Sequence, residues 1–321
     1  MAPEKTQRLD QFAGAKYMLP NLLVNPGFEI WQRGVGPFTA SAAFTADEWA
    51  LPGTGATATK ETTEVHGGVS SLKIVTTANT SGIHQGVECY KSLEGLEVTF
   101  SVWVKSSNAS VKAFLGDYNG SSEYATMAYH SGGGDWELLT CTKVIRTGLI
   151  TESSWPHGFG IRVGVTQDDA VATYYVDSAV AVAAEVAFPE GLSYAPLNPA
   201  EDKARCQRFY ETGLDVRTVR ACGATSNSNQ GAHTRSFQYK ASKLATPTVT
   251  LANKSIKSLS AFGGTWSDRT SQESPPSRQY IYFYSDVDGF LSGIVWDEAT
   301  YGPQMYNFGL DLSCDWSAEV T

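Results

Sequence analysis

The sequence predicts an all-β protein in which two β-sandwich domains are joined by a short helix. Three observations predict this fold class. Short segments alternate between apolar and polar residues, which is the period of a strand with one buried face. Glycine-rich breaks separate these segments, as at residues 53–55, 67–68 and 132–134. Only one segment, near residue 200, carries the start signals of a helix.

The composition indicates a folded protein that does not bind nucleic acid. Of the 321 residues, 42% are hydrophobic, which is enough for real cores. The formal net charge is −9 and the basic residues are scattered, which argues against binding to a phosphate backbone. The 5 cysteines occur singly, so we expect reduced, buried thiols and neither a zinc site nor a disulfide framework.

Residues 1–20 are expected to form a polar N-terminal arm that docks on a neighbouring subunit or packs on its own domain. The stretch Met1–Asp10 lacks the apolar core of an export signal. No stretch has the unbroken apolar length of a membrane-spanning helix. We therefore expect assembly in a cytosol and no membrane insertion.

The first domain is expected over residues 21–190. Its opening stretch Asn21–Val24 predicts a short buried strand, and the following Asn-Pro-Gly predicts a turn in which Gly27 can take a positive φ. Glu29 comes next, among large apolar side chains. A carboxylate buried there needs a partner, and a solvated Glu at a sheet edge is the alternative.

Further strands of this domain follow from period-two alternation. They are expected at residues 71–76, 98–105, 137–145, 160–165 and 173–182. In the second of these, Val98, Phe100, Val102 and Val104 share one face. About ten strands without a helix-length periodic segment predict an antiparallel sandwich.

Several motifs resemble known families. Five segments resemble strands of the carbohydrate-binding modules of families 4, 9 and 22. They are Asn21–Glu29, Val65–Ile74, Thr99–Lys105, Trp136–Leu139 and Tyr175–Asp177. This resemblance implies that the first sandwich is a jelly roll. The continuations Ile30–Gly34 and Phe44–Trp49 resemble the version in phage and prophage virion proteins, such as tail-fibre-like and capsid decoration proteins.

The resemblance to the carbohydrate-binding modules also implies a structural calcium ion, with Glu29 and Asp177 as candidate ligands. Calcium takes about six to eight oxygen ligands, so backbone carbonyls near Lys60 or Glu61 would have to contribute. The alternative is that both carboxylates accept hydrogen bonds and hold no ion.

Residues 191–213 are expected to form the linker and its helix. Asn198 can cap the helix, Pro199 suits its first position, and Glu201 completes a capping box. Gly213 is expected to end the helix.

The run Cys206–Tyr210 resembles a Cys-Gln-Arg-Tyr-Tyr signature of phage tail-fibre-like proteins, with Phe209 in place of one Tyr. A second β domain is expected over residues 214–321 as an assembly or exposed domain. Its predicted strands are residues 235–239, 248–251, 279–284, 290–296 and 314–320.

A sugar site needs an aromatic platform beside polar groups. The candidates are residues of the middle strands and of one Gly- and Ser-flanked loop. They are Tyr118, Asn119, Tyr124, Tyr129 and Trp155. For each aromatic residue, a place in the core is the alternative.

No pattern predicts a catalytic site, so we expect a non-enzymatic protein. The acidic pairs Asp47-Glu48, Asp168-Asp169 and Asp297-Glu298 are adjacent, and neighbours in a strand point to opposite faces. We expect them to be solvated loop charges. The 5 histidines show no paired metal-binding spacing.

Together these features predict a structural protein of the bacteriophage virion. It would belong either to the tail, as a fibre or spike, or to the capsid, as a decoration protein or head fibre. It would assemble in the host cytoplasm, bind other virion proteins, and use its jelly roll to aid attachment to host surface polysaccharide. The alternative is an accessory carbohydrate-binding module of a glycoside hydrolase, or a free lectin. Calcium is the one cofactor that the resemblance implies.

We also expect a homotrimer, because similar phage proteins are closed trimers. In Gln279–Tyr284, Tyr side chains share one strand face while Ile281 and Phe283 take the other, so both faces are bulky. A second bulky face favours a subunit interface. The alternative is a sandwich with Tyr hydroxyls at its surface.

Overall fold

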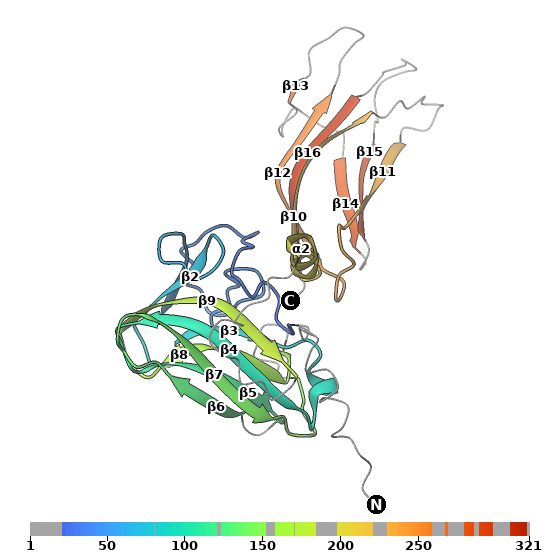
Figure 1. Ribbon diagram of the computed structural model, residues 1–321. Coiled ribbons are helices and arrows are strands. Elements are labelled where there is room, and N and C mark those ends of the chain that lie inside the picture. Colours follow the sequence, from blue (N-terminus) through green and yellow to red (C-terminus); the bar gives the residue numbers. More distant parts are fainter. Residues whose placement is uncertain are drawn as a thin grey trace, which may run out of the picture. The chain divides into compact units, whose positions relative to one another are not determined.

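The structure is a computed structural model in which the chain forms two compact units, residues 1–202 and 203–321 (Figure 1). It describes residues 21–79, 81–120, 123–151, 158–169, 171–183, 198–220, 230–258, 267–268, 279–285, 289–297 and 309–319. Strands dominate both units, so the all-β prediction is confirmed. The predicted arm, residues 1–20, lies outside the described residues.

The N-terminal unit is a sandwich of two antiparallel sheets. Its strands are β1 (Ala56–Glu61), β2 (Ser71–Thr76), β3 (Gly82–Gly86), β4 (Glu97–Ser106), β5 (Val111–Tyr118), β6 (Glu123–Tyr129), β7 (Trp136–Val144), β8 (Ile161–Gln167) and β9 (Ala172–Val182). One sheet has the order β1-β2-β9-β4-β7, and the other has the order β3-β8-β5-β6. We call them the five-stranded and the four-stranded sheet. The strands predicted near residues 71, 98, 137, 160 and 173 are all present.

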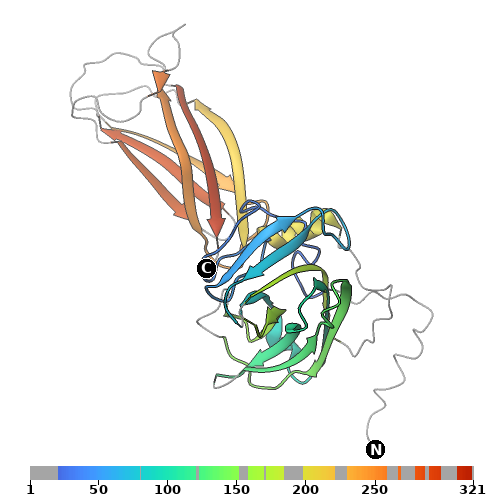
Figure 2. The same cartoon turned by 90° about the vertical axis from the view of Figure 1, so that its left-hand side faces the viewer.

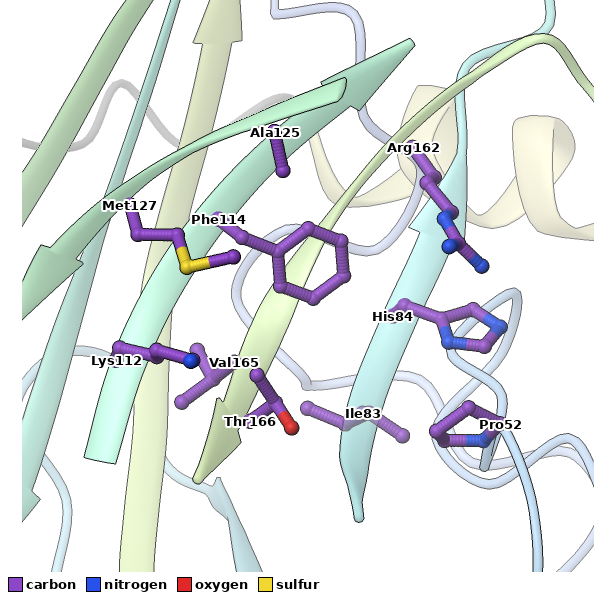
Figure 3. Close-up of a pocket in the computed structure, with 10 residues that line it drawn as sticks. All are labelled: Pro52, Ile83, His84, Lys112, Phe114, Ala125, Met127, Arg162, Val165 and Thr166. Carbon is purple, nitrogen blue, oxygen red and sulfur yellow. The ribbon is translucent and has the colours of Figure 1, made fainter. Parts of the chain in front are cut away.

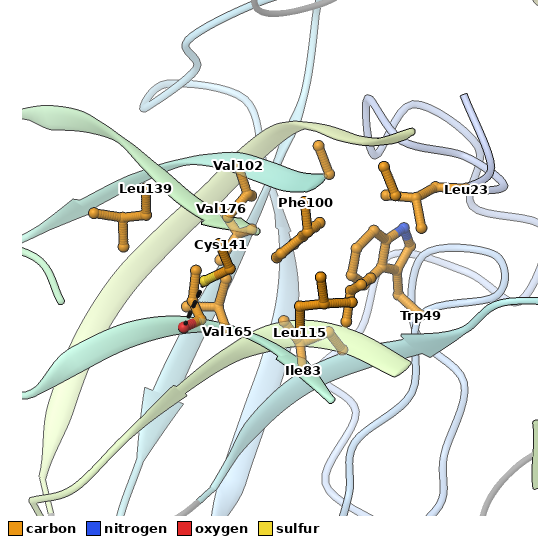
Figure 4. Close-up of a cluster of buried hydrophobic side chains, with 14 of the residues drawn as sticks. Leu23, Trp49, Ile83, Phe100, Val102, Leu115, Leu139, Cys141, Val165 and Val176 are labelled. Carbon is orange, nitrogen blue, oxygen red and sulfur yellow. Dashed lines mark hydrogen bonds between the residues drawn. The ribbon is translucent and has the colours of Figure 1, made fainter. Parts of the chain in front are cut away.

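The core lies between the two sheets (Figure 4). From the five-stranded sheet, the predicted face of β4, including Phe100 and Val102, is fully buried. From the four-stranded sheet, alternate residues of β5 such as Leu115 are equally buried. The Cys141 thiol in β7 donates a hydrogen bond to the Ala113 carbonyl in β5, at 3.5 Å. Since the inner faces are filled with apolar side chains, any polar site on these sheets belongs to an outer face.

The opening stretch does not form the predicted strand. Leu23 is fully buried, but residues 21–28 have irregular backbone. The positive φ angles fall on Asn25 (49°) and Phe28 (53°), and not on Gly27. The side-chain Oδ1 of Asn25 explains the positive φ of Asn25, because it accepts hydrogen bonds from the amides of Glu29 and Ile30, both at 3.0 Å. Asn tolerates the left-handed region when its side chain bonds the local backbone in this way.

The helix α2 (Pro199–Gln207) is shorter than predicted. Its start is as expected, because the side chain of Asn198 accepts a hydrogen bond from the Ala200 amide at 3.0 Å. The helix does not extend to Gly213, which lies within strand β10 and pairs with Trp316. The chain leaves the helix early because β10 forms a long antiparallel ladder with the last strand, and this ladder satisfies the backbone groups.

The C-terminal unit has two antiparallel sheets. Its strands are β10 (Tyr210–Arg220), β11 (Gln230–Gln238), β12 (Thr248–Ser258), β13 (Ser267–Asp268), β14 (Gln279–Ser285), β15 (Gly289–Asp297) and β16 (Gly309–Glu319). The sheet orders are β10-β16-β12-β13 and β11-β15-β14. In Figure 2 the long orange and red strands run beside one another. The side chains of β14, on which the trimer prediction depends, lie outside the described part of the structure.

Three thiols are described, and one corrects the prediction of buried cysteines. Cys141 and Cys206 are buried, whereas Cys89 is exposed. Cys89 directly precedes the 3-10 turn η1 (Tyr90–Leu93), which buries Tyr90 and Leu93 and leaves the residue before it at the surface. Among the described residues, no helix is both long and apolar enough to cross a membrane.

Candidate functional site

The outer face of the four-stranded sheet carries the candidate site. In β5, Val111, Ala113 and Leu115 are fully buried in the core. Because successive side chains of a strand point to opposite faces, the intervening Lys112 and Phe114 lie on the outer face. This face is therefore defined by the residues of β3, β8, β5 and β6 that are in phase with these two.

The strand register aligns polar and apolar residues in rows across this face. In the first row, Lys112 pairs with Thr166 of β8 and with Tyr129 of β6. Tyr129 is 53% exposed, so its ring stands at the open edge of the face.

The next row places an aromatic ring over a glycine. Phe114 pairs with Gly164 of β8 and Met127 of β6, and Gly164 pairs in turn with His84 of β3. A Cβ atom at position 164 would lie 2.8 Å from the ring of Phe114, so the glycine is what allows the ring to lie across β8. Met127 is 47% exposed beside the ring. The centre of the face is thus an accessible apolar surface.

A pocket of about 250 Å³ opens on this face (Figure 3). Its lining combines apolar side chains with a few nitrogen-bearing ones. The lining residues are Pro52, Ile83, His84, Lys112, Phe114, Ala125, Met127, Arg162, Val165 and Thr166. Concave sites with an apolar floor and a few convergent polar groups are the usual form of small-ligand sites.

Arg162 provides a partly buried cation at one side of the pocket. Its guanidinium carbon lies 6.0 Å from the centre of the Phe114 ring, within the range of a cation–π contact. Burial lowers the pKa of Arg162 to about 9, because removal of water disfavours the charged form. The guanidinium is still charged at neutral pH, and it is poorly hydrated.

His84 lies next to Arg162 in Figure 3, toward Pro52. It is 3% exposed, and burial together with the nearby charge of Arg162 holds its pKa well below the usual range. The imidazole is therefore neutral at pH 7, with one ring nitrogen as donor and the other as acceptor.

Lys112 is held at the other side of the pocket by two partners. Its Nζ atom lies 2.5 Å from Oδ1 of Asp168 and 3.3 Å from the hydroxyl oxygen of Tyr129, and that hydroxyl donates to Oδ2 of Asp168 at 3.2 Å. Burial opposes the charge of Lys112, but the two hydrogen bonds outweigh burial and raise its pKa. The hydrogen bond from Lys112 lowers the pKa of Asp168. This pair is charge-balanced, so Lys112 fixes the Tyr129 ring more than it adds positive potential.

The predicted sugar-contact residues have different locations. Tyr129 borders the pocket, whereas Tyr118 lies at the end of β5, half-buried, with its hydroxyl donating to the Gly120 carbonyl at 3.2 Å. Asn119 is exposed in the turn after β5. Tyr124 pairs with Asp117 in the register, and its side chain lies outside the described part. Trp155 lies outside the described residues. The sequence reasoning missed Phe114, for which the signal was its place between buried alternate residues.

Glu29 and Asp177, the candidate calcium ligands, hold the loop between β1 and β2. Oε1 of Glu29 accepts from the Val69 amide at 2.7 Å, and Oδ2 of Asp177 accepts from the amides of His66 and Gly67 at 2.8 and 2.9 Å. These N–H donors occupy carboxylate oxygens that an ion would use. Among the described residues, no group of three or more His, Cys, Asp or Glu side chains could hold a metal ion. An ion there would depend mainly on backbone oxygens, and calcium stays a prediction.

One acidic pair departs from the prediction of solvated charges. Asp47 and Glu48 are 0% and 4% exposed. Asp47 is enclosed because the segment after Glu29 folds over it, so that Gln32 donates from its backbone amide at 3.1 Å and from its side chain at 2.6 Å. Arg33 forms an ion pair with it at 3.5 Å. Burial raises the pKa of Asp47 to about 6.

No protein-family model matches the chain, and no curated protein matches it. One similar solved structure is the CBM22-1–GH10 module pair of Clostridium thermocellum xylanase 10B, complexed with xylohexaose. It matches at 15% identity and a TM-score of 0.34, over 46% of this chain and 28% of that chain. The CBM22-1 xylan-binding domain of Paenibacillus barcinonensis Xyn10C matches at 14% identity and a TM-score of 0.37, over 53% and 97% of the two chains. The enzymatically active domain of bacteriophage CBA120 tailspike protein 4 matches at 12% identity and a TM-score of 0.33, over 50% and 21%.

Proposed function

We propose that the N-terminal unit is a non-catalytic glycan-binding module and that its binding surface is the outer face of the four-stranded sheet. The observation that carries this proposal is the Phe114 ring, which lies in an open pocket with Arg162 and His84 beside it (Figure 3). A pyranose ring presents an apolar C–H face and a rim of hydroxyls. It therefore suits an aromatic surface that is bordered by hydrogen-bonding side chains.

The size of the pocket supports the binding of one unit of a chain ligand rather than of a whole compact ligand. Its volume of about 250 Å³ is below the range of roughly 300–1,000 Å³ that is usual for drug-sized ligands. One sugar unit would sit over Phe114, and its neighbours would extend along the exposed Met127 and Tyr129. Most of the polymer would then remain in solvent, as attachment to a surface polysaccharide requires.

We further propose that the chain is a component of a phage virion, either a tail fibre or spike, or a capsid decoration protein. In this proposal the C-terminal unit assembles the protein as a homotrimer. The support is in the sequence: the run Cys206–Tyr210 and the stretch Phe44–Trp49 resemble such proteins. The second candidate function is that of an accessory module of a glycoside hydrolase, or of a free lectin. The same pocket would then bind the glycan. An antibody against this chain that labels intact phage particles would favour the virion, and labelling of cell-wall fractions alone would favour the accessory module.

A glycan array of the full-length chain tests the binding surface. We expect Phe114→Ala to lose the signals that the wild-type chain gives. Tyr175→Ala is the matched control, because Tyr175 is a half-buried aromatic residue of β9, in the five-stranded sheet. Undiminished binding by Phe114→Ala, or an equal loss in Tyr175→Ala, would contradict the proposed surface.

A further inference from the structure

We propose that the open edge of β6 pairs with the same edge of a second copy of this chain, so that two four-stranded sheets join into one. The inference concerns an interaction surface, and it does not depend on which ligand the pocket binds. It comes from the contrast between the two sides of the sandwich, one of which the chain closes with its own backbone.

The segment that precedes β1 closes one side of the sandwich. At β1, Phe38 exchanges two hydrogen bonds with Ala58, each at 2.9 Å. At β3, Ala50 exchanges two hydrogen bonds with His84, at 2.9 and 3.0 Å. These bonds use backbone groups that would otherwise point outward from the edge strands. A further strand is therefore excluded at both places.

On the other side, both sheets end in strands with one partner each. Among the described residues, β6 pairs with β5 alone and β7 pairs with β4 alone. The strand β7 carries Glu137 and Lys143, and charged side chains are a common guard against pairing at a strand edge. Residues 124–129 of β6 include no charged residue and no proline. The edge of β6 is therefore the less protected of the two.

The hydrogen-bond phase of the sheet shows which groups of β6 face outward. The amide of His130 donates to the carbonyl of Val111, directly opposite in β5, at 2.9 Å. Opposed residues of an antiparallel ladder alternate between hydrogen-bonded and non-hydrogen-bonded pairs. The backbone groups of every second residue of β6 therefore point away from β5. These residues are Ala125, Met127 and Tyr129.

The side chains of these three residues suit pairing with a second copy. When two β6 strands lie antiparallel about Met127, Met127 faces its own copy, and Ala125 faces Tyr129 of the second copy. All three are exposed on the outer face. The small Ala125 leaves room for the large Tyr129 ring, and cross-strand pairs of this kind stabilise a sheet. Every outward amide and carbonyl of the three residues gains a partner in this register.

The charge of the chain favours this edge for self-association. With a formal net charge of −9, two copies repel each other over most of their surfaces. The nearest ionic groups beside Tyr129 are Lys112 and Asp168, which form an ion pair and balance each other. A contact along β6 therefore brings together surfaces that are locally neutral.

The pairing would place two pockets on one continuous face, because opposed residues of an antiparallel pair lie on the same side of a sheet. Three strand spacings would separate the two Phe114 residues, which is roughly 14 Å. On the proposed function, one polysaccharide chain would then contact both pockets and bind with higher avidity. A two-fold contact joins chains in pairs, so it would link the proposed trimers to one another without replacing them.

Cysteine cross-linking of the full-length chain tests the pairing and its register. Two copies of Met127 would face each other at about 5.5 Å between Cα atoms, which a disulfide can span. We expect Met127→Cys to form a disulfide-linked dimer under copper-catalysed air oxidation, seen on a non-reducing gel. The wild-type chain gives the background from its own thiols. Val171→Cys measures linkage by random collision, since Val171 is 70% exposed and lies outside β6.

A mixture of two variants tests the register. Equal amounts of Ala125→Cys and Tyr129→Cys chains should link to each other, and more than either variant links to itself. Adding Met127→Pro to both chains should abolish this linkage, because proline removes an outward amide and leaves the bonds to β5 in place. Met127→Leu is the matched control, since it keeps that amide. Circular dichroism verifies each fold, and the comparison of Met127→Cys with Val171→Cys decides the matter even where the proline variant does not fold.

Each outcome bears on the pairing alone. Linkage of Met127→Cys at the level of Val171→Cys would overturn the proposal. Linkage of Met127→Cys without linkage in the mixture of Ala125→Cys and Tyr129→Cys would overturn the antiparallel register. Linkage of Thr140→Cys, in the middle of β7, in place of linkage through β6 would overturn the choice of edge. The glycan array measures the proposed function separately, so failure of one leaves the other standing.

Discussion

Asp177 gives the pH dependence of stability a definite sign. It is fully buried in β9, and burial raises its pKa to about 6 from an ordinary value of 3.8. The folded state therefore binds a proton more tightly than the unfolded state does. Between about pH 4 and pH 6 this residue makes the N-terminal unit less stable as pH rises, and above that window its contribution is constant.

The magnitude follows from the shift in pKa. A difference of about two pKa units corresponds to roughly 3 kcal/mol between the two ends of the window. Asp177→Asn removes the ionisation. It keeps an oxygen that can accept from the amides of His66 and Gly67, and the Ser178 hydroxyl, 3.3 Å from the carboxylate, can accept from the new amide. The loop thus stays bonded while the titration is lost.

Urea unfolding of the full-length chain, followed by tryptophan fluorescence at pH 4 to 7, measures this effect. We expect the free energy of unfolding of the N-terminal unit to fall more gently with pH in Asp177→Asn than in the wild type. Some slope should remain, because burial also raises the pKa of Asp47 to about 6. Asp168→Asn is the control, since Asp168 is exposed and its pKa is lowered. Identical slopes in the wild type and Asp177→Asn would contradict a raised pKa of Asp177 in the folded state.

Three further predictions concern the loop, the chemistry and the assembly. Glu29→Gln should lower the free energy of unfolding of the N-terminal unit by about 1.5–3 kcal/mol, since it weakens charge-assisted hydrogen bonds such as that from the Val69 amide. Bound calcium is tested separately on the wild type, where a melting temperature that EDTA leaves unchanged would contradict it. The purified chain should release no reducing sugar from host polysaccharide, and release abolished by one Asp or Glu substitution would show a hydrolase. Light scattering should detect a trimer that is lost in Tyr282→Asp, and a wild-type monomer at micromolar concentration would contradict the trimer.

The sequence revealed strands where apolar residues alternate with polar ones, even where the polar residues are also buried, as Thr99 and Ser101 are in β4. In β4 the alternation of Val98, Phe100, Val102 and Val104 was readable because the intervening residues are mostly polar. In β3 the first four residues are all buried, and the short segment of one apolar and two polar residues between its end glycines shows no alternation over several residues. Asp47 was also misjudged, because only the tertiary fold of the preceding loop encloses it.

The candidate site could not be read from the sequence for a related reason. His84, Phe114 and Arg162 come from three strands that are far apart in the chain. The register that brings β3, β8 and β5 together is a tertiary property, and a shift by one residue would turn each of these side chains into the core. Tyr129 was predicted because a sugar site needs an aromatic platform beside polar groups, and this residue lies in the middle strands next to His130. Its role beside Lys112 and Asp168 became visible only in the structure.

The methyl group of Met127 offers the most direct measurement of glycan binding at this face. The chain has 4 methionines, and Met127 lines the pocket with 47% of its surface exposed. The full-length chain, labelled with ¹³C at the methionine methyl groups and assigned through Met127→Leu, is titrated with a polysaccharide that it binds. If glycan binds at this face, the Met127 resonance shifts and saturates with the binding curve. An unmoved Met127 resonance in the presence of saturating, bound glycan would contradict the assignment of this face as the binding surface.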